Sequence, residues 1–166
     1  MGRAFVLVGA PAMGKSSLLR EIPSVIELAT CIDLENASAS TSTETLLSFV
    51  EDVMRITWRG PLFVGCGNVN PMGFAEIGFE VIGLHHENEA QYRQRMRDRD
   101  LANGWGTQGD FWASHRRLLT ESMPARDIQT FMVDTCHSEL DGQIDKTIRM
   151  IAKKFDLPTM PRKPLN

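Results

Sequence analysis

The chain has 166 residues, of which 42% are hydrophobic and 23% charged, with a formal net charge of −3 at pH 7. This length suits one domain with a single core, and no apolar run approaches the roughly 20 residues that span a bilayer, which argues against a membrane protein. The negative charge argues against a protein whose whole surface grips nucleic acid. Three widely spaced cysteines, Cys31, Cys66 and Cys136, fit neither a disulfide framework nor a zinc site, so we expect a cytoplasmic protein.

In chain order, the first expected element is an apolar strand at residues 4–8, which leads into a glycine-containing loop. Helical spacing of apolar residues follows at 17–22, and we expect Pro23 to end that helix. Val, Ile and Thr enrich residues 24–32, which indicates a second strand that ends at Asp33. The chain therefore begins as strand, loop, helix and strand.

The middle of the chain continues this alternation. Residues 46–57 have the three- and four-residue apolar spacing of an amphipathic helix, which Ser42 or Thr43 can cap. A buried strand is expected at 62–66, followed by a turn-rich connection at 71–78.

The second half begins with a strand at 79–84 and an exposed, arginine-rich helix at 86–99. A glycine and tryptophan loop follows at 103–109, and Asp110 can cap a further helix that runs through Leu119.

The last expected elements are a fifth strand at 130–134 and a helix whose apolar stripe runs from Ile144 to Phe155. Strands that alternate with helices predict an α/β fold with a five-stranded parallel sheet and helices on both faces. The expected domain covers residues 1–157, and a tail with three prolines covers 158–166.

The loop after the first strand matches the pattern GxxxxGK[ST] completely and lies between a strand and a helix, as phosphate binding requires. Its two glycines can turn successive N–H groups toward phosphate oxygens, and the following helix adds a partial positive charge. Lys15 would reach the β- and γ-phosphates, and the Ser16 hydroxyl would bind Mg²⁺. We expect ATP to be bound by Gly9, Ala10, Pro11, Ala12, Met13, Gly14, Lys15, Ser16 and Ser17.

Two large classes of P-loop protein are not favoured by the rest of the sequence. The strand at 62–66 is not followed by the aspartate that large ATPases and GTPases use near magnesium, and no Asn-Lys-x-Asp sequence is present to read guanine.

Over nearly its full length the chain instead resembles the small nucleotide and metabolite kinases of the P-loop class. Four features carry the resemblance: the early phosphate loop, Asp33 at the end of the second strand, the arginine-rich segment from Gln91 to Gly109, and Val133-Asp134-Thr135 before the last helix. The resemblance implies a three-layer P-loop fold with an arginine-rich lid at about 86–109. It also implies that Asp134 and Thr135 contact the adenine side of ATP.

The turn Asn68-Val69-Asn70-Pro71 is similar to the Asn-Leu-Asn-Pro turn of phage polynucleotide kinases. That likeness implies an acceptor site that includes Asn68 and Asn70. We also expect Trp105 and Arg116 to contact the acceptor, because rings and cations together can stack bases and hold phosphates.

Phosphoryl transfer needs an aligned acceptor hydroxyl and neutralisation of the negative charge that develops. Asp33 could accept the hydroxyl proton or hold magnesium together with Ser16, and Glu35 is the alternative carboxylate. Guanidinium groups in the lid would clamp the γ-phosphoryl oxygens. In one helix Arg93 and Arg97 share a face while Arg95 and Arg99 lie roughly opposite, so not all four can reach one site. We favour Arg93 and Arg97 for this catalytic role, with Arg99 as a further candidate.

The sequence therefore predicts an ATP- and Mg²⁺-dependent kinase whose acceptor is a hydroxyl of a nucleotide or polynucleotide. DNA is an expected partner, with a hydroxymethylated pyrimidine as the acceptor in a phage enzyme that works in the host cytoplasm. The alternative acceptor is a nucleoside monophosphate or a small metabolite of the shikimate or gluconate kind. A hypothesis of another class is a regulatory subunit that binds ATP and transfers nothing. The oligomeric state stays open.

Overall fold

The computed structural model of the chain describes residues 2–34, 42–56, 59–67, 70–106, 111–136 and 142–162. Its strands form one sheet in the order β2-β3-β1-β4-β5, and every neighbouring pair is parallel. The strands are β1 (Ala4–Val8), β2 (Thr30–Asp33), β3 (Leu62–Gly65), β4 (Glu80–His85) and β5 (Thr130–Asp134). The expected α/β class and the five-stranded parallel sheet are confirmed.

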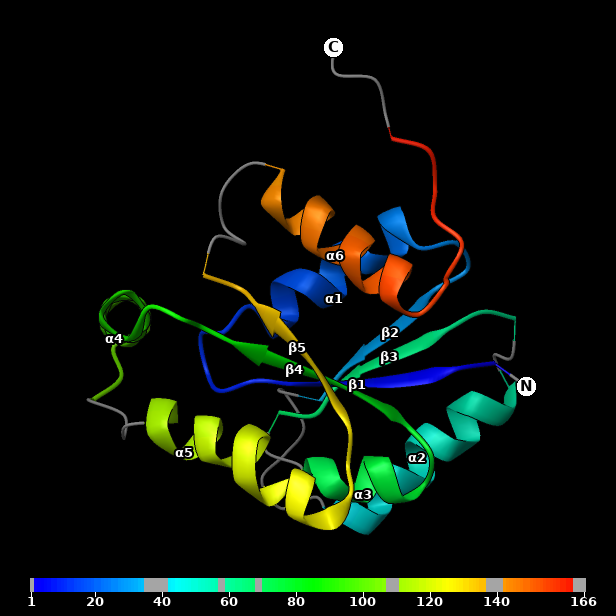
Figure 1. Cartoon of the computed structure of the whole chain (residues 1–166), viewed down its shortest axis with the longest axis horizontal. Coiled ribbons are helices and arrows are strands. Elements are labelled where there is room, and N and C mark those ends of the chain that lie inside the picture. The colour runs from blue at the N-terminus through cyan, green and yellow to red at the C-terminus, as the bar shows by residue number, and fades with distance from the viewer. Residues whose placement is uncertain are drawn as a thin grey trace.

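Helices cover both faces of the sheet (Figure 1). One face carries α1 (Lys15–Val25) and α6 (Gln143–Lys154), and the other carries α2 (Thr43–Ile56), α3 (Pro71–Glu76) and α5 (Phe111–Arg117). A π-helical turn, Leu118–Ser122, and a 3₁₀ turn, Pro124–Arg126, continue from α5. No helix in the described ranges is both long and apolar enough to cross a membrane.

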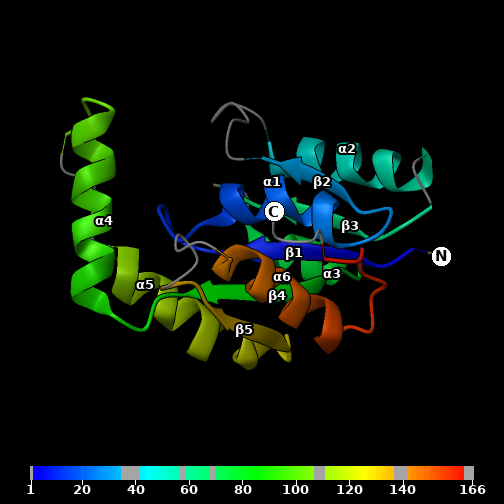
Figure 2. The same ribbon diagram turned by 90° about the horizontal axis from the view of Figure 1, so that it is seen from above.

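The remaining helix, α4 (Glu89–Ala102), stands at one end of the molecule, beyond the ends toward which β1 and β4 point (Figure 2). Asn88 caps it, because its side chain accepts the N–H of Gln91 at 2.9 Å. Although this helix was expected to be exposed, Tyr92 and Met96 are buried in the core and so attach it to the body of the protein.

The central strand β1 explains why the core has two parts. Its five residues are all buried, since parallel strands between two helical layers are covered on both faces. Phe5 and Leu7 pack with α1 and α6, whereas Val6 and Val8 pack with α2 and α3. Phe5 also stacks on Phe63 of β3, with ring centroids 4.8 Å apart.

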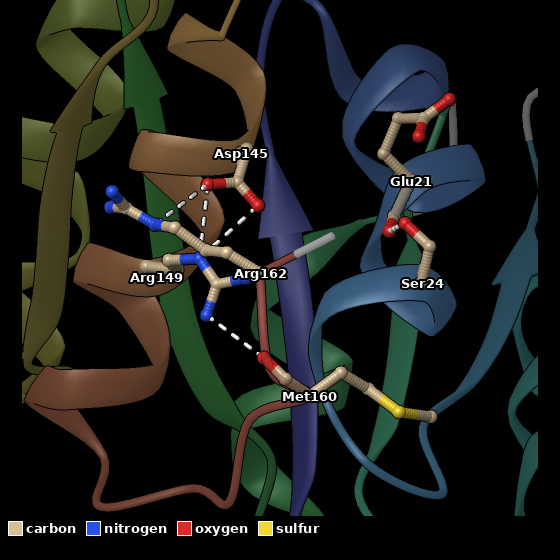
Figure 3. A network of polar contacts seen from close by, with 6 residues as sticks. All are labelled: Glu21, Ser24, Asp145, Arg149, Met160 and Arg162. Atoms are coloured by element: carbon tan, nitrogen blue, oxygen red, sulfur yellow. Dashed lines mark hydrogen bonds and ion pairs between the residues drawn. The ribbon is translucent and has the colours of Figure 1, made fainter. Parts of the chain in front are cut away.

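The tail after α6 is tied back to the first helix. The N–H of Met160 donates to the carbonyl of Val25 at 2.8 Å. Arg149 of α6 donates to the carbonyl of Met160 at 3.1 Å and to both carboxylate oxygens of Asp145, and Arg162 lies 3.9 Å from the same carboxylate (Figure 3). The proline-containing tail thus packs against α1 and α6.

The predicted end of the first helix is wrong. The helix does not end at Pro23. Pro23 lies within the last turn of α1, where its missing N–H costs one hydrogen bond. The helix still closes behind it, since the N–H of Ile26 donates to the carbonyl of Ile22 at 2.8 Å. Consequently β2 starts at Thr30 instead of residue 24.

The connection expected to be turn-rich at 71–78 contains α3. Pro71 occupies the start of this helix, where its fixed φ is favourable, and the Asn70 side chain caps it by accepting the N–H of Met72 at 3.0 Å. An asparagine followed by proline is a helix start signal that the sequence reading missed.

Candidate active site

The phosphate loop links β1 to α1 and has a constrained backbone. Gly14 has a left-handed φ of 84° at the N-cap of α1, and Ala12 has a positive φ of 63°. At Gly9 an added Cβ would lie 3.2 Å from the Cβ of Leu84 and 3.3 Å from the Cγ of Lys15. Glycine is therefore favoured by its backbone angle at position 14, and at position 9 a side chain would have to displace Leu84 or Lys15 slightly.

Lys15 folds back into this loop. Its side chain is only 5% exposed, and its Nζ donates to the carbonyl of Gly9 at 2.5 Å and to that of Ala10 at 3.3 Å. A buried ammonium group beside a helix N-terminus makes this loop a place for anionic oxygens.

Ser16 and Asp33 meet next to the loop, although they are far apart in the sequence. The Ser16 hydroxyl donates to Oδ2 of Asp33 at 2.7 Å. The sheet creates the contact, because β2 pairs with β3 and brings Asp33 opposite Gly65. A Cβ at Gly65 would come within 2.7 Å of Leu19 and 3.5 Å of Asp33, so the small residue keeps this corner open. A hydroxyl beside a carboxylate is an oxygen pair that fits Mg²⁺.

Two arginines of α4 face the phosphate loop across a cavity of about 240 Å³. The cavity is lined by Ala12, Met13, Gly14, Lys15, Ser16, Ser17, Arg95 and Arg99. Arg95 and Arg99 are both partly buried, and Arg95 donates to the carbonyl of Cys136 at 3.5 Å. Arg99 also lies over the Trp105 ring, 5.0 Å from its centroid, and contacts Asp100 at 3.2 Å.

The structure does not place Arg93 and Arg97 at this cavity, although the sequence reading favoured them. Arg93 pairs with Glu89 at 2.7 Å, and the exposed Arg97 donates to Gln94 at 2.7 Å. The two arginine pairs do lie on different faces of the helix, as expected, but the face turned to the loop is the other one.

Tyr92 fixes that orientation. Its ring is 2% exposed, and its hydroxyl donates to the carbonyl of Pro11 in the phosphate loop at 2.9 Å. Arg95 and Arg99 follow it by three and seven residues, so they lie on the same face of α4. The sequence reading missed Tyr92 and Arg95, and this shared face is the signal that could have identified them.

A second cavity of about 340 Å³ lies beside the first and shares Met13 with it. We call it the α5 pocket. It is lined by Met13, His85, His86, Glu87, Trp112, His115, Arg116, Leu119, Thr120 and Met132. Arg116 was an expected substrate contact, and the structure brings it to this wall.

Local contacts give the α5 pocket a defined shape. The indole N–H of Trp112 donates to the carbonyl of His86 at 3.1 Å, and the guanidinium carbon of Arg116 lies 5.1 Å from the centroid of the Trp112 ring. Nε2 of His115 contacts the carbonyl of Leu84 at 2.6 Å, which identifies that nitrogen as the protonated one. Burial lowers the pKa of His115, the hydrogen bond to Leu84 acts in the opposite direction, and the nearby Lys15 and His85 add to the lowering, so the ring of His115 is neutral at pH 7.

Asp134 and Thr135, expected beside the adenine of ATP, hold the end of the sheet together. Asp134 accepts the N–H of Cys136 at 3.0 Å, its thiol at 3.1 Å and the N–H of Glu87 at 3.4 Å. Burial acts to raise the pKa of Asp134, but these hydrogen bonds outweigh it and lower the pKa below its usual value. Thr135 donates twice to the carbonyl of His85, at 2.9 and 3.1 Å. The adenine contact stays a prediction.

The other expected substrate residues are not gathered at the loop. Trp105 is 51% exposed and lies outside the lining of both cavities, and the Asn70 side chain caps α3. Glu35 and Asn68 lie outside the described residues.

No model of a known protein family matches the sequence, and a search of curated proteins found no match either. Solved structures do match over nearly the whole chain. The chain shares its α/β fold with them. A gluconokinase from Sinorhizobium meliloti 1021 is similar at TM-score 0.54 and 16% identity, over 93% of this chain and 95% of that one.

Two further structures support the same fold. A tunicamycin resistance protein from Deinococcus radiodurans is similar at TM-score 0.61 and 14% identity, over 98% of this chain and 100% of that one. A shikimate kinase from Bacteroides thetaiotaomicron is similar at TM-score 0.52 and 14% identity, over 93% and 99% of the two chains. The likeness concerns the fold, and the residues of the site must carry any argument about function.

Proposed function

We propose that the chain is an ATP- and Mg²⁺-dependent phosphotransferase that moves the γ-phosphoryl group to a hydroxyl of a small molecule. The observation that carries the proposal is the convergence of four polar side chains on one cavity, with a carboxylate behind one of them. Lys15, Ser16, Arg95 and Arg99 line the cavity, and the Ser16 hydroxyl donates to Asp33.

Each of these groups has a role in handling the phosphates. The loop N–H groups and Lys15 hold the β- and γ-phosphates, for which the ammonium gives up its carbonyl partners. Arg95 and Arg99 approach from α4 and neutralise the negative charge on the transferred group. Magnesium would be held by Ser16 with Asp33 beside it, and it would shield the negative charge of the phosphates.

Asp33 has two candidate roles, and its contact favours one of them. Because its carboxylate accepts the Ser16 hydroxyl at 2.7 Å, it lies beside the residue that a P-loop uses for magnesium. We assign Asp33 to the metal side of the site together with Ser16. The acceptance of a proton from the substrate hydroxyl is its second candidate role.

The comparisons favour a small metabolite over DNA as the acceptor, because a gluconokinase and a shikimate kinase share the fold. A nucleotide or polynucleotide, including a hydroxymethylated pyrimidine in DNA, is the second candidate. One observation supports it: Trp112 and Arg116 lie together in a cavity next to the phosphate loop. A regulatory subunit that binds ATP without transfer is the alternative from another class.

The test is transfer of radiolabel from [γ-³²P]ATP to sugar acids, free nucleosides, nucleotides and DNA with modified bases. We expect a labelled product that requires Mg²⁺, and we expect Asp33→Asn to lower turnover by about 10²-fold or more while ATP binding changes little. Ser24→Ala is the matched control, because it also removes a hydrogen bond from α1, to the carbonyl of Glu21, but away from the loop. ATP binding with no transfer to any acceptor would instead support the regulatory subunit.

A further inference from the structure

The α5 pocket is placed where a phosphoryl acceptor has to lie. Met13 forms part of its wall and part of the wall of the phosphate cavity, so a ligand in the pocket would lie beside the loop. His85, His86 and Glu87 line it from the carboxyl end of β4. Ligands of open α/β sheets bind at this end of the strands.

The lining of the pocket is unusually rich in flat side chains. Five of its ten residues carry a planar conjugated group, namely His85, His86, Trp112, His115 and Arg116. Three more, Met13, Leu119 and Met132, are flexible and apolar. Rings and methionine sulfur make favourable contacts with aromatic ligands, whereas guanidinium groups stack on them.

The lining also offers polar groups to a ligand, because its imidazoles and its guanidinium are hydrogen-bonding groups as well as flat ones. Two polar groups of the lining are already engaged: Nε2 of His115 with the carbonyl of Leu84 at 2.6 Å, and the Thr120 hydroxyl, which donates to the carbonyl of Arg116 at 2.8 Å. A flat ring with few polar substituents can lie against Trp112 and still reach the polar groups that remain.

Arg116 is held ready for a ligand. Most arginines of the described chain pair with a carboxylate, as Arg93 does with Glu89 and Arg149 with Asp145. Within the same described ranges Arg116 forms no such ion pair, and its guanidinium lies against the Trp112 ring instead. Since Trp112 is itself anchored to the backbone of β4's end through His86, the ring and the cation form one fixed surface.

Resting on the proposed kinase function, we infer that the α5 pocket binds the phosphoryl acceptor, and that this acceptor is a planar heteroaromatic ring bearing a hydroxyl or hydroxymethyl group. Transfer joins the acceptor oxygen to the γ-phosphorus, breaks the bond between that phosphorus and ADP, and releases the hydroxyl proton to water. The ring can belong to a free small molecule or to the base of a nucleotide or polynucleotide.

The experiment measures binding and transfer with five probes. Pyridoxine, 5-hydroxymethyl-2′-deoxyuridine and an oligonucleotide containing 5-hydroxymethyluracil carry the ring, whereas D-gluconate and shikimate do not. Binding is followed by quenching of tryptophan fluorescence in the presence of Mg²⁺ and ADP, and transfer by label from ATP. We expect saturable quenching by at least one ring probe and transfer to the same probe. Transfer to pyridoxine or to the free nucleoside would indicate a small-molecule acceptor. Transfer to the oligonucleotide alone would indicate a base in DNA.

Three variants locate the effect. Affinities of the variants are measured by calorimetric titration, because changes at Trp112 remove the fluorescent ring of the pocket. Trp112→Leu should weaken binding of the ring probe by about tenfold or more, and Trp112→Phe should restore most of the affinity because it retains a ring. Phe49→Leu is the matched control, since Phe49 of α2 is 53% exposed and lies outside the pocket lining, and the affinity of this variant should stay within about twofold of wild type. If Trp112→Leu fails to fold, Arg116→Ala, at an exposed position, tests the same surface with the same expected direction.

Transfer to gluconate or shikimate alone, without saturable quenching by any ring probe, would overturn this inference and leave the kinase function standing. An equal loss of affinity in Trp112→Leu and Phe49→Leu would show that the ring probe does not bind in the α5 pocket. Failure of the wild type to bind ATP would overturn the proposed function itself.

Discussion

Ala12 adopts a backbone conformation that its side chain disfavours. Its φ of 63° is in the left-handed region, which costs a residue with a Cβ roughly 1–2 kcal/mol. The neighbouring Gly14, with φ of 84°, avoids this cost because it has no Cβ. The phosphate loop therefore contains a strained alanine at a position where the backbone suits glycine.

Replacement of Ala12 by glycine should stabilise the protein. The relief of strain exceeds the added entropy of the unfolded chain, so we expect a gain of about 0.5–1 kcal/mol in the free energy of unfolding. The measurement is the urea unfolding midpoint at unchanged m-value.

Ala10→Gly is the matched control in the same loop. Ala10 is buried and is not among the residues with positive φ, so glycine there should destabilise by about 1 kcal/mol. A loss of stability in both variants would show that the strain at Ala12 is absent.

Single site residues could be predicted from the sequence where the chemistry requires a particular residue type at a particular spacing. The loop residues and the partnership of Ser16 with Asp33 were expected, and the structure brings the last two within 2.7 Å. Asn70 was assigned to the substrate but caps α3, because a side chain that can bind a ligand can equally satisfy a helix terminus.

Among the helices and strands, the main feature that was not predicted from the sequence is the rotation of α4 about its axis. The helix is polar on most sides, so arginines at alternate positions look equivalent in the sequence. The rotation is set by burial of Tyr92 and Met96 and by the hydrogen bond from Tyr92 to Pro11, a residue 81 positions earlier. The apolar pair Tyr92 and Met96 marks the buried face of α4 in the sequence, but the contact that turns this face toward the phosphate loop joins distant segments and leaves no local pattern.

The orientation of α4 predicts which arginines matter for turnover. Arg95→Ala and Arg99→Ala should each lower kcat by about 10²-fold or more, because each removes a positive charge aimed at the transferred group. Arg93→Ala and Arg97→Ala should stay within about threefold of wild type, since Arg93 pairs with Glu89, Arg97 donates to Gln94 and neither lines the phosphate cavity. The measurement is steady-state kcat for all four variants. A larger loss in Arg93→Ala or Arg97→Ala than in the other pair would contradict the structure of this helix.

Element boundaries depended on signals that compete. Pro23 indicated the end of a helix, yet the last turn tolerates proline and the chain continued to Val25. Pro71 indicated a turn but started a helix, since the asparagine before it supplies the cap. A proline can end a helix, lie within it or start it. Only the residues around the proline determine which of these occurs.

For the whole molecule, the alternation of apolar runs and helical spacing was enough to predict the architecture. The near-continuous apolar sequence of β1 already indicates a strand covered on both faces, and the structure confirms it. The side-by-side arrangement of the phosphate cavity and the α5 pocket was not predictable, because it depends on where α5 crosses beneath β4. Topology brings Trp112 and His115 close to Met13, a residue about a hundred positions away.

The central claim is that the loop at residues 9–16 binds the triphosphate of ATP, and calorimetric titration with Mg²⁺ and a non-hydrolysable ATP analogue tests it most directly. We expect saturable binding at one site in the wild type and a loss of affinity of at least about tenfold in Lys15→Ala, which removes the buried ammonium group. A wild-type protein that shows no saturable heat of binding, or a Lys15→Ala variant that binds as tightly as the wild type, would contradict the account.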